Sequence, residues 1–389
     1  MQPLRILADD LTGALDTAGC FMADGQTLPL IFEAGAIPRT GSCALSTETR
    51  DVSEDEALAR LSAFETAFDR FDGLAFKKID SLLRGHVAAE IAHVVRQNRF
   101  DAAILAPAFP ALSRVTRNGR QWAKLAGHDQ FEMIGPDLVR DFARFNIDVQ
   151  RGPPSDKTAT PRVFLCDANT EDDLRSVVDR GMRAGRVLWC GSAGLAEAIA
   201  GGIAPLPLTA RRILVICGTR HAVASLQIRE LCREEPAALA SLTPGYDAAA
   251  AAAGINKRLQ TDTWAALAAD FPDLPAAEAR RLLDTALRDV LPRLDRPDAV
   301  IVMGGDTLAV CNSVLGASGL AVRGLLARGI AISEFSDGAW AGLPVISKSG
   351  AFGSADTLRQ IIEMTAAGRT EYSIAPAPRG SFGQKVECR

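Results

Sequence analysis

The sequence predicts an α/β protein of two domains, each a largely parallel sheet covered by helices, with a cleft between the domains. Three observations predict this fold. Short apolar runs alternate with amphipathic helical patterns, which is typical of parallel strands joined by helices. The alternation stops once, at APLPLTAR (204–211), where two prolines interrupt the periodicity, and then resumes. The chain of 389 residues is also long enough for each domain to bury its own core.

The first domain is predicted over residues 1–205. Its candidate strands are, in order, LRILA (4–8), LPLIFE (28–33), CALST (43–47), GLAFKKI (73–79), AAILAP (102–107), RVFLCD (162–167) and RVLWCG (186–191). Two helix starts between these strands carry capping boxes. Ser53 is followed by Glu56 in one of them. Thr170 is followed by Asp173 in the other, and in both cases apolar residues then recur at helical spacing.

The second domain is predicted over residues 211–375. Its candidate strands are RILVIC (212–217), AVIVMG (299–304) and LPVISK (343–348). The alanine-rich stretch Ala248–Ala253 predicts a helix. A closing helix is predicted after Ser354, which we expect to cap it.

The composition limits the partners and the compartment. The formal net charge of −4 gives no general attraction to nucleic acid, so nucleic acid is not expected as a partner. The eight cysteines lie singly, without a CxxC pair, which indicates reduced thiols in a cytoplasmic protein. Charges and prolines interrupt the apolar runs, so neither a signal peptide nor a membrane-spanning segment is expected. The four histidines lack the spacing of a zinc site, and the protein alone is expected to build no metal site.

The first predicted strand ends in two adjacent acids, Asp9 and Asp10, followed by Thr12 and Gly13. In α/β folds, ligands bind where a strand ends and the next helix begins. Free N–H groups at the start of that helix favour an anion. One acid can simply cap the helix, so the pattern leaves helix capping and a ligand site open as alternatives.

Three further segments place charged residues at the ends of predicted strands. They are FKKIDSLLRGH with Lys78, Asp80, Ser81 and Arg84, STETRDVS with Arg50, and APAFPALSRVTRNGRQW with Arg114. Lysine and arginine at such an edge bind a carboxylate or a phosphate. The alternative for the first segment is a solvated basic turn that pairs with Asp80. In the third segment two prolines favour an extended loop from which Arg114 projects, and Asn118-Gly119 predicts a hairpin turn.

Two glycine turns in the second half follow the same pattern of strand, turn and helix. Gly304 and Gly305 precede Asp306 and Thr307, and their backbone N–H groups could approach a phosphate. In SKSGAFGSADTL, Gly350 and Gly353 lie between a strand and a helix. The alternative is a turn that merely needs a positive φ. The chain contains no GxGxxG dinucleotide fingerprint and no Walker A lysine.

Together these segments resemble the four-carbon acid sugar kinase family, whose members include enzymes similar to D-threonate, D-erythronate and 3-oxo-tetronate 4-kinases. The resemblance rests on segments in the family's order: ADDLTGALDTAG, TETR, KKIDSLLRG, APAFPALSR, GSAGLAEAIA, SLQI, GGDT and KSGAFG. It spans nearly the whole chain. It implies an N-terminal domain that binds the sugar acid, a C-terminal domain that binds ATP, and an inter-domain active-site cleft.

The resemblance also implies site residues. Those on the sugar acid are Asp9, Asp10, Arg50, Lys78, Ile79, Asp80 and Ser81, to which the charged rim adds Arg84 and Arg114. Those on ATP are Gly304, Gly305, Asp306, Thr307 and Gly350, to which the turns add Thr219 and Gly353. Two departures from the family pattern stand out. CGTRHAVASLQI replaces a pattern that begins SGS-x-S, so that Thr219 takes the place of a serine, and Leu82 replaces a threonine.

We therefore expect an ATP-dependent kinase that phosphorylates the terminal (C4) hydroxyl of a four-carbon sugar acid, with Mg²⁺ arriving on ATP. Asp10 is expected to accept the hydroxyl proton, and Asp306 is the alternative base or a magnesium ligand. Two other functions stay open: a non-catalytic sugar-acid sensor, and a phosphatase with an aspartate nucleophile, although that class needs acids two positions apart. A membrane partner is not expected. The sequence leaves the sugar acid and the oligomeric state open, with a homodimer as one option.

Overall fold

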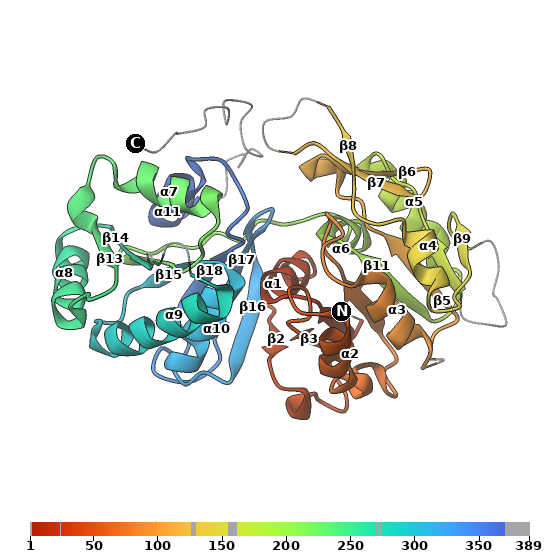
Figure 1. Ribbon diagram of the computed structural model, residues 1–389, viewed down its shortest axis with the longest axis horizontal. Coiled ribbons are helices and arrows are strands. Elements are labelled where there is room, and N and C mark those ends of the chain that lie inside the picture. The colour runs from red at the N-terminus through yellow and green to blue at the C-terminus, as the bar shows by residue number, and fades with distance from the viewer. Residues whose placement is uncertain are drawn as a thin grey trace.

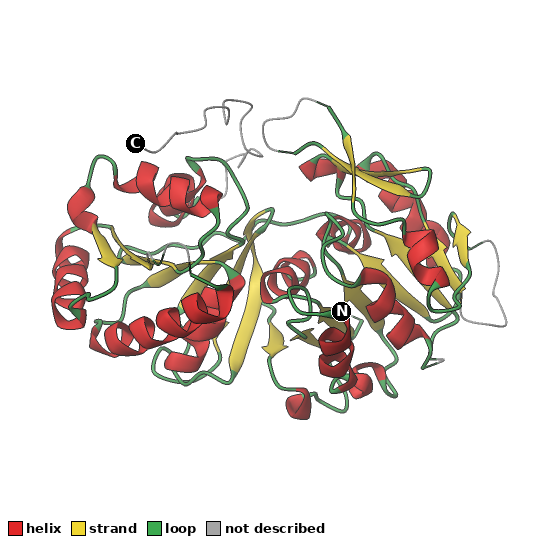
Figure 2. Ribbon diagram, viewed as in Figure 1, coloured by secondary structure: helices red, strands yellow, loops and turns green. Residues whose placement is uncertain are grey.

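The computed structural model describes residues 2–369, except 24, 98, 126–129, 155–161, 270 and 272–273. Its described strands form one sheet of fifteen strands and a separate sheet of three. Figure 1 shows the N-terminal half, coloured from red through yellow to light green, beside the C-terminal half, coloured from green to blue. The large sheet runs through both halves, and helices cover both of its faces (Figure 2). Residues 370–375 of the second predicted domain lie outside the described residues.

The N-terminal half contributes eight parallel strands, in the order β2-β3-β1-β4-β11-β5-β10-β9. Their bounds are β1 Leu4–Ala8, β2 Leu28–Ile31, β3 Cys43–Ser46, β4 Leu74–Lys78, β5 Ala102–Ala106, β9 Val149–Arg151, β10 Arg162–Leu165 and β11 Val187–Gly191. Every residue of β1, β3, β5 and β11 is buried, as expected of strands covered on both faces. The seven strands predicted for this half are confirmed, and β9 was not predicted.

The C-terminal half contributes five parallel strands, β13-β14-β12-β15-β18, followed by the antiparallel strands β17 and β16. Their bounds are β12 Ile213–Cys217, β13 Leu239–Leu242, β14 Trp264–Ala269, β15 Ala299–Met303, β16 Gly319–Ala327, β17 Ile330–Phe335 and β18 Pro344–Lys348. The predicted strands are confirmed as β12, β15 and β18. Strand β16 also pairs with β2 in the antiparallel sense, so the two halves share one sheet.

Eleven α-helices lie in the described part of the chain. Their bounds are α1 Leu11–Cys20, α2 Glu54–Ser62, α3 Val87–Val95, α4 Leu138–Ala143, α5 Glu171–Gly181, α6 Ala193–Ala200, α7 Ala222–Cys232, α8 Ala248–Thr261, α9 Ala276–Val290, α10 Gly305–Val314 and α11 Thr357–Ala367. The capping box of Thr170 is confirmed, and Ser53 accepts a hydrogen bond from the Glu56 N–H group. The prediction that Ser354 caps the last helix is wrong, because α11 begins three residues later with Asp356 as its N-cap residue. None of the described helices is long and apolar enough to cross a membrane.

The separate small sheet follows β5 and lies at the N-terminal half of the molecule (Figure 1). It consists of β6 Arg114–Arg117, β7 Arg120–Ala123 and β8 Glu132–Ile134. Asn118 and Gly119 form the predicted hairpin turn with positive φ values of 52° and 70°. The proline-containing loop before β6 is not simply extended, because residues 110–112 form one turn of 3₁₀ helix.

Helix α1 lies at the centre of the molecule. It packs on β1 and β3 of its own half and on β16 and β17 of the other half. Leu15 of α1 belongs to the same buried apolar cluster as Leu320 and Leu325 of β16. Thr12, Gly13 and Asp16 of α1 face the cleft, while the apolar residues of the helix form part of the core between the halves.

The segment between the two predicted domains, residues 206–210, contains neither helix nor strand. It runs beside β16, where the Leu206 N–H group donates a hydrogen bond of 2.7 Å to the Leu325 carbonyl oxygen. A division of the chain at this segment stays a prediction.

Candidate active site

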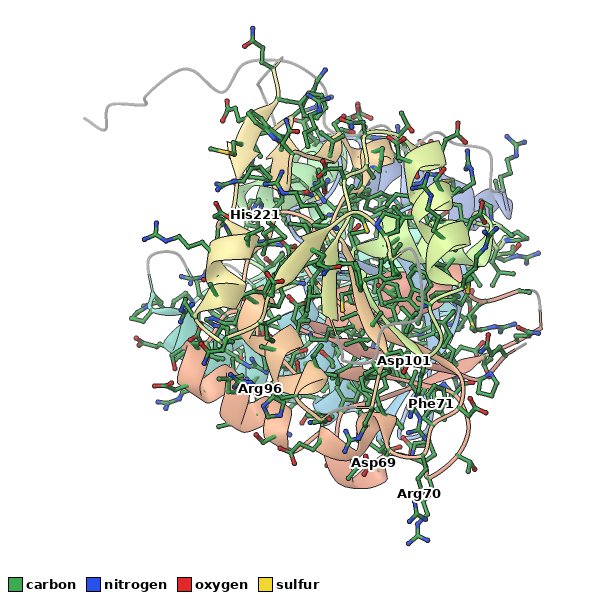
Figure 3. All side chains as sticks on the ribbon, turned by 90° about the vertical axis from the view of Figure 1, so that its right-hand side faces the viewer. Asp69, Arg70, Phe71, Arg96, Asp101 and His221 are labelled. Carbon is green, nitrogen blue, oxygen red and sulfur yellow. The ribbon has the colours of Figure 1, made fainter. Side chains whose placement is uncertain are left out.

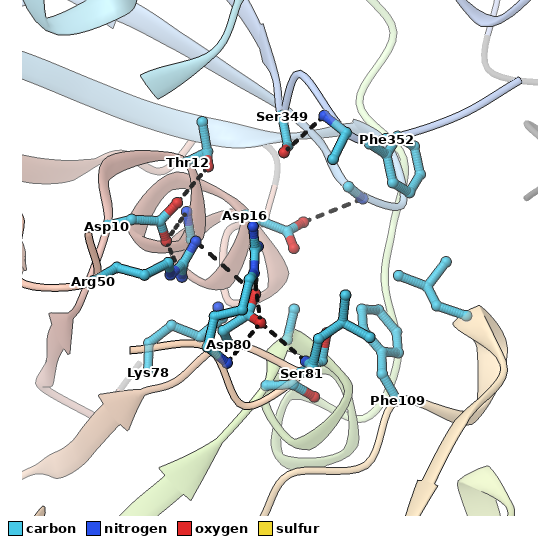
Figure 4. Close-up of a pocket in the computed structure, with 18 of the residues that line it drawn as sticks. Asp10, Thr12, Asp16, Arg50, Lys78, Asp80, Ser81, Phe109, Ser349 and Phe352 are labelled. Carbon is cyan, nitrogen blue, oxygen red and sulfur yellow. Dashed lines mark hydrogen bonds and ion pairs between the residues drawn. The ribbon is translucent and has the colours of Figure 1, made fainter. Parts of the chain in front are cut away.

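A cavity of about 210 Å³ lies between the two halves (Figure 4). Seven of the predicted residues line it: Asp10, Arg50, Lys78, Asp80, Ser81, Arg84 and Arg114. They follow the carboxyl ends of β1, β3, β4 and β5, so the four strand ends meet at one place as the sequence predicts. The C-terminal half closes the other side with residues that include His221, Ser349 and Phe352.

Arg50 binds both of the acids that follow β1. Its Nε and Nη2 atoms donate to the Asp9 carboxylate at 2.9 and 2.8 Å, and Nη2 also donates to Asp10 Oδ1 at 2.5 Å. Burial alone would raise the pKa of Asp9, but the charge and hydrogen bonds of Arg50, aided by Lys78, hold that pKa below its usual value. Asp9 is therefore a buried counter-ion, and Asp10 is the member of the pair that lines the cavity.

Asp10 also caps helix α1. Its Oδ1 atom accepts a hydrogen bond of 3.0 Å from the Gly13 N–H group, and its Oδ2 atom accepts one of 2.7 Å from Thr12 Oγ1. The capping interpretation is therefore correct for Asp10, which also faces the cleft. Its role in ligand binding stays a prediction. Three donors from the protein, including Arg50, occupy its carboxylate.

A second buried network of polar side chains lies next to Arg50, on the other face of the sheet. Lys77 Nζ lies 2.7 Å from Glu90 Oε2, and the two side chains are 0% and 2% exposed. Glu90 Oε1 accepts a hydrogen bond from Thr49, the residue before Arg50. Successive side chains of a strand point to opposite faces of the sheet, so Lys77 takes this structural role while Lys78 faces the cavity.

Lys78 and Arg114 are the two cations of the cavity without a carboxylate partner. Among the described residues, no acid lies within 4.0 Å of either charged group, and Arg114 Nη1 donates only to Ser81 Oγ, at 2.5 Å. Lys78 is 6% exposed, and burial lowers the pKa of Arg114. A buried cation without an anion is costly unless a ligand supplies the negative charge.

Asp80 organises the turn after β4. It accepts hydrogen bonds from the Leu82 and Arg84 N–H groups, and the Arg84 guanidinium donates to its two oxygens at 3.0 and 2.8 Å. Burial would raise the pKa of Asp80, but the Arg84 hydrogen bonds and the charge of Arg50 hold it well below its usual value. The interpretation as a basic turn paired with Asp80 is thus correct for Arg84, although Arg84 still lines the cavity.

Asp16 is a cavity residue that the sequence analysis missed. It lies on α1, within the ADDLTGALDTAG segment, and its Oδ1 atom accepts a hydrogen bond of 3.2 Å from the Gly329 N–H group of the other half (Figure 4). Burial raises the pKa of its carboxyl group to about 6, against the lowering charges of Lys78 and Arg114. The available signal was its position four residues after Thr12 and three after Gly13, which places it on the same face of the helix.

The predicted nucleotide turns meet beside the cavity. Gly304 has a φ of 96°, which a residue with a side chain rarely adopts, and it precedes α10 as its N-cap residue. A Cβ atom on Gly350 would lie 2.7 Å from Thr219 Oγ1, so Gly350 leaves room only for backbone at that point. Thr307 Oγ1 accepts a hydrogen bond of 3.2 Å from the Gly218 N–H group, which joins the turn after β15 to the turn after β12. The three turns thus form one glycine-rich surface.

Several predicted residues do not line the cavity. Asp306 is largely exposed and pairs with Arg280 at 2.6 Å. Gly353 packs against Thr357 at the start of α11. Ile79 is 1% exposed in the apolar core, and its N–H group donates to the Gly191 carbonyl oxygen. Gly305 belongs to the α10 turn and lies against Thr12 of α1.

Two further residues of the C-terminal half border the site without having been predicted. His221 lines the cavity and caps α7, where its Nδ1 atom accepts a hydrogen bond from the Val223 N–H group. Burial, with the charges of Lys348 and Arg84, lowers the pKa of His221. Lys348 is 1% exposed, and its Nζ atom donates to the Ser349 and Phe352 carbonyl oxygens at 2.8 Å each. Lys348 thereby fixes the loop that carries Ser349 and Phe352 into the cleft.

Buried cations elsewhere have internal partners. Arg5 is 1% exposed, its guanidinium donates to backbone carbonyls that include Ala67 O, and its charge lies over the Phe71 ring. Figure 3 shows Phe71 near Asp69 and Asp101, at the end of the view away from His221. Arg5 is therefore structural, and this contrast strengthens the significance of Lys78 and Arg114.

The described residues contain no group of three or more histidine, cysteine, aspartate or glutamate side chains that could hold a metal ion. Beside nucleotides, Mg²⁺ commonly takes one or two carboxylates, waters and phosphate oxygens as its ligands.

Comparisons with known proteins match a family to part of each half of the chain. The chain matches the family described as "Sugar-binding N-terminal domain" over residues 4–135 and the family described as "Nucleotide-binding C-terminal domain" over residues 214–358. A D-threonate kinase from Cupriavidus necator is 29% identical, over 90% of this chain and 94% of that protein. A D-erythronate kinase from Heliobacterium modesticaldum is 24% identical, over 92% of this chain and 95% of that protein.

Two solved structures have a similar fold. A protein from Salmonella typhimurium LT2, described as a tRNA synthase, has a TM-score of 0.66 and 18% identity over 90% of this chain and 96% of its own. A Haemophilus influenzae protein of the DUF1537 family has a TM-score of 0.65 and 17% identity over 94% of this chain and 99% of its own. At these identities the likeness shows the fold alone.

Proposed function

Because the chain belongs to the four-carbon acid sugar kinase family, which joins a sugar-binding to a nucleotide-binding domain, we propose that it transfers a phosphoryl group from ATP to the terminal (C4) hydroxyl of a four-carbon sugar acid. The observation that carries the proposal is the pair of uncompensated cations, Lys78 and Arg114, in a cavity that is also lined by Ser349 and Ala351, the neighbours of Gly350. The acid is of the threonate, erythronate or 3-oxo-tetronate type.

The sugar acid binds in the N-terminal part of the cavity. Arg114 and Lys78 bind its carboxylate, because neither of them is paired with a carboxylate of the protein. Arg50 is already paired with Asp9 and Asp10. Asp10 and Ser81 are placed to bind the hydroxyl groups of the acid. Asp80 keeps Arg84 at the open side of the cavity, where the guanidinium can neutralise charge on the transferred group.

ATP binds on the C-terminal half, with its phosphates at the turns of Thr219, Gly304 to Thr307 and Gly350. The N–H groups at the start of α10 point out of the helix and favour an anion. The close approach of Gly350 and Thr219 leaves backbone atoms to contact the phosphates. When bound with ATP, Mg²⁺ supplies neutralisation of phosphate charge. Asp306 lies in the first turn of α10, and it is the acid that we expect to bind this Mg²⁺.

The test is a screen of the purified protein with ATP, Mg²⁺ and a panel of threonates, erythronates and 3-oxo-tetronates. We expect ADP release that depends on one acid, and ³¹P NMR should show a phosphate ester on C4. A Lys78→Met variant should lose the activity. An Arg60→Met variant, which removes an exposed ion pair with Glu56, should keep it.

Other outcomes of the same screen would contradict the proposal. Acid binding without ADP release would indicate the sensor, and release of phosphate from a sugar-acid phosphate without nucleotide would indicate the phosphatase. The phosphatase is disfavoured because Asp9 is buried under Arg50 and cannot serve beside Asp10 as a second cavity acid.

A further inference from the structure

We propose that Asp16 is the catalytic residue that accepts the proton of the attacking hydroxyl, in place of Asp10. The inference rests on the proposed kinase function and deepens it. It follows from what the acids around the cavity are bonded to, and from the position of Asp16 between the two halves.

The other acids each accept more hydrogen bonds than Asp16 does, or lie outside the cavity. Asp9 is 3% exposed and accepts hydrogen bonds from Nε and Nη2 of Arg50. Asp10 accepts from Arg50, Thr12 and the Gly13 N–H group. A carboxylate that is held ionised by several donors is a weak base, because protonation would break those hydrogen bonds.

Asp80 is excluded for the same reason. The Asp80 carboxylate accepts hydrogen bonds from the guanidinium and the backbone N–H group of Arg84 and from the Leu82 N–H group. In addition, Arg50 Nη1 lies 3.9 Å from Asp80 Oδ1. Asp306 lies on the exposed side of α10 and pairs with Arg280.

Asp16 differs from these acids in geometry. It lines the cavity, and its Oδ1 atom accepts a single hydrogen bond, from the Gly329 N–H group in the turn between β16 and β17. No described residue donates a hydrogen bond to Oδ2. Because Gly329 belongs to the C-terminal half, the Asp16 carboxylate lies where the two halves meet at the cavity.

The electrostatic surroundings suit a proton acceptor. Burial raises the pKa of Asp16 to about 6, and Asp10 on the same helix adds to the rise, while Lys78 of β4 and Arg114 of β6 oppose it. Cys20 lies on the same helix, and Glu197 of α6 faces Asp16 while paired with Arg328. A base whose pKa lies just below neutrality is ionised at rest and still accepts a proton readily.

The step balances without another reactant. The terminal hydroxyl oxygen of the sugar acid forms a bond to the γ-phosphorus of ATP, and the bond from that phosphorus to the β,γ-bridging oxygen breaks. The electron pair of the broken bond leaves on ADP. The hydroxyl proton passes to Asp16 Oδ2 and is then lost to water when the products leave.

The experiment compares Asp16→Asn with the wild-type enzyme. The amide oxygen of asparagine can still accept the Gly329 N–H hydrogen bond, so the variant removes basicity and keeps the contact between the halves. We expect kcat to fall by about 10²-fold or more, with the KM values for acid and ATP nearly unchanged. The wild-type rate should rise with pH through an acid limb near pH 6, and the residual rate of the variant should lack this limb.

Glu197→Gln is the matched control. Burial raises the pKa of Glu197 to about 7, so Glu197 could produce a similar limb, but it does not line the cavity. This variant keeps a hydrogen-bond acceptor for Arg328 Nε and should retain both kcat and the limb.

Two results would overturn the inference: an Asp16→Asn enzyme with wild-type kcat, or an acid limb that persists in this variant and disappears in Asp10→Asn. Both leave the kinase function intact, because the wild-type enzyme still phosphorylates the acid. If the wild-type enzyme phosphorylates no acid of the panel, the proposed function fails first, and the inference fails with it.

Discussion

Arg50 and Asp9 form a two-point ion pair at the end of β1, with N···O distances of 2.9 and 2.8 Å, and the same guanidinium reaches Asp10 at 2.5 Å. The charge of Arg50 is therefore used inside the protein before any ligand binds. Its role in the site is to fix Asp10 and the end of the strand. This relationship separates Arg50 from Arg114, which the sequence places in the same class of ligand-binding arginines.

Arg50→Ala should destabilise the protein and lower kcat together. Removing one partner of a buried pair leaves Asp9 uncompensated, at a cost of about 3 to 5 kcal/mol. Thermal unfolding at neutral pH measures the first effect, and steady-state kinetics measure the second. Arg50→Lys should recover only part of the stability, because an ammonium cannot make the two-point contact. A variant that unfolds like the wild-type protein but binds the acid weakly would instead assign the carboxylate of the acid to Arg50.

Arg114→Ala should show the opposite pattern. We expect the KM for the sugar acid to rise by about ten- to a hundred-fold, since a charge-assisted hydrogen bond contributes on the order of 1.5 to 3 kcal/mol. The KM for ATP should change little. The melting temperature should stay the same or rise, because the guanidinium is buried without a carboxylate partner. A large drop in stability with an unchanged KM would show that Arg114 is structural.

Asp16→Asn should stabilise the protein above pH 6. The pKa of Asp16 in the fold is about 6, above its ordinary value of 3.8. Between these pH values the folded protein binds a proton that the unfolded chain has lost, so the contribution of Asp16 to stability falls as pH rises. Above pH 6 the ionised carboxylate is a constant cost that asparagine removes. Melting curves of the two proteins at several pH values measure this difference, and a less stable variant at neutral pH would contradict it.

Gly350→Ala should weaken ATP binding and leave acid binding unchanged. The added Cβ atom would lie 2.7 Å from Thr219 Oγ1 and must push the two turns apart. We expect a higher KM for ATP by roughly tenfold, the effect of about 1.4 kcal/mol. Gly245→Ala is a suitable control, because Gly245 lies in a turn with no atom near its added Cβ, although its positive φ also strains that variant. Equal effects of the two changes on the KM for ATP would contradict the assignment.

The sequence predicts the strand ends well because each is marked twice, by an apolar run and by the charges that follow it. Asp9, Asp10 and Arg50 are all placed correctly at one edge in this way. The sequence does not show that Asp9 neutralises Arg50, because this ion pair forms only if β1 and β3 are neighbours in the sheet. Asp16 was missed because an acid within a helix usually faces solvent, whereas both sides of α1 are covered.

The hairpin of β16 and β17 was missed for a different reason. Its sequence, GLAVRGLLARGIAISEF, has glycine and arginine between short apolar groups and lacks a two-residue turn of the usual type. Strand β17 pairs with the next strand, β18, whereas β16 pairs with β2, which lies far away in the sequence. Contacts of this kind override local preference and cannot be deduced from a single segment.

The pairing of β2 with β16 has a consequence for how the chain can be divided. A cut between residues 205 and 206 would leave β2 with an open edge of unpaired N–H and C=O groups, and would uncover the apolar side of α1 that packs on β16. Such edges recruit other chains. Fragments 1–205 and 206–389 made alone should therefore aggregate, whereas the same fragments made together can find each other through this strand pair. We therefore expect the two halves to fold together rather than separately.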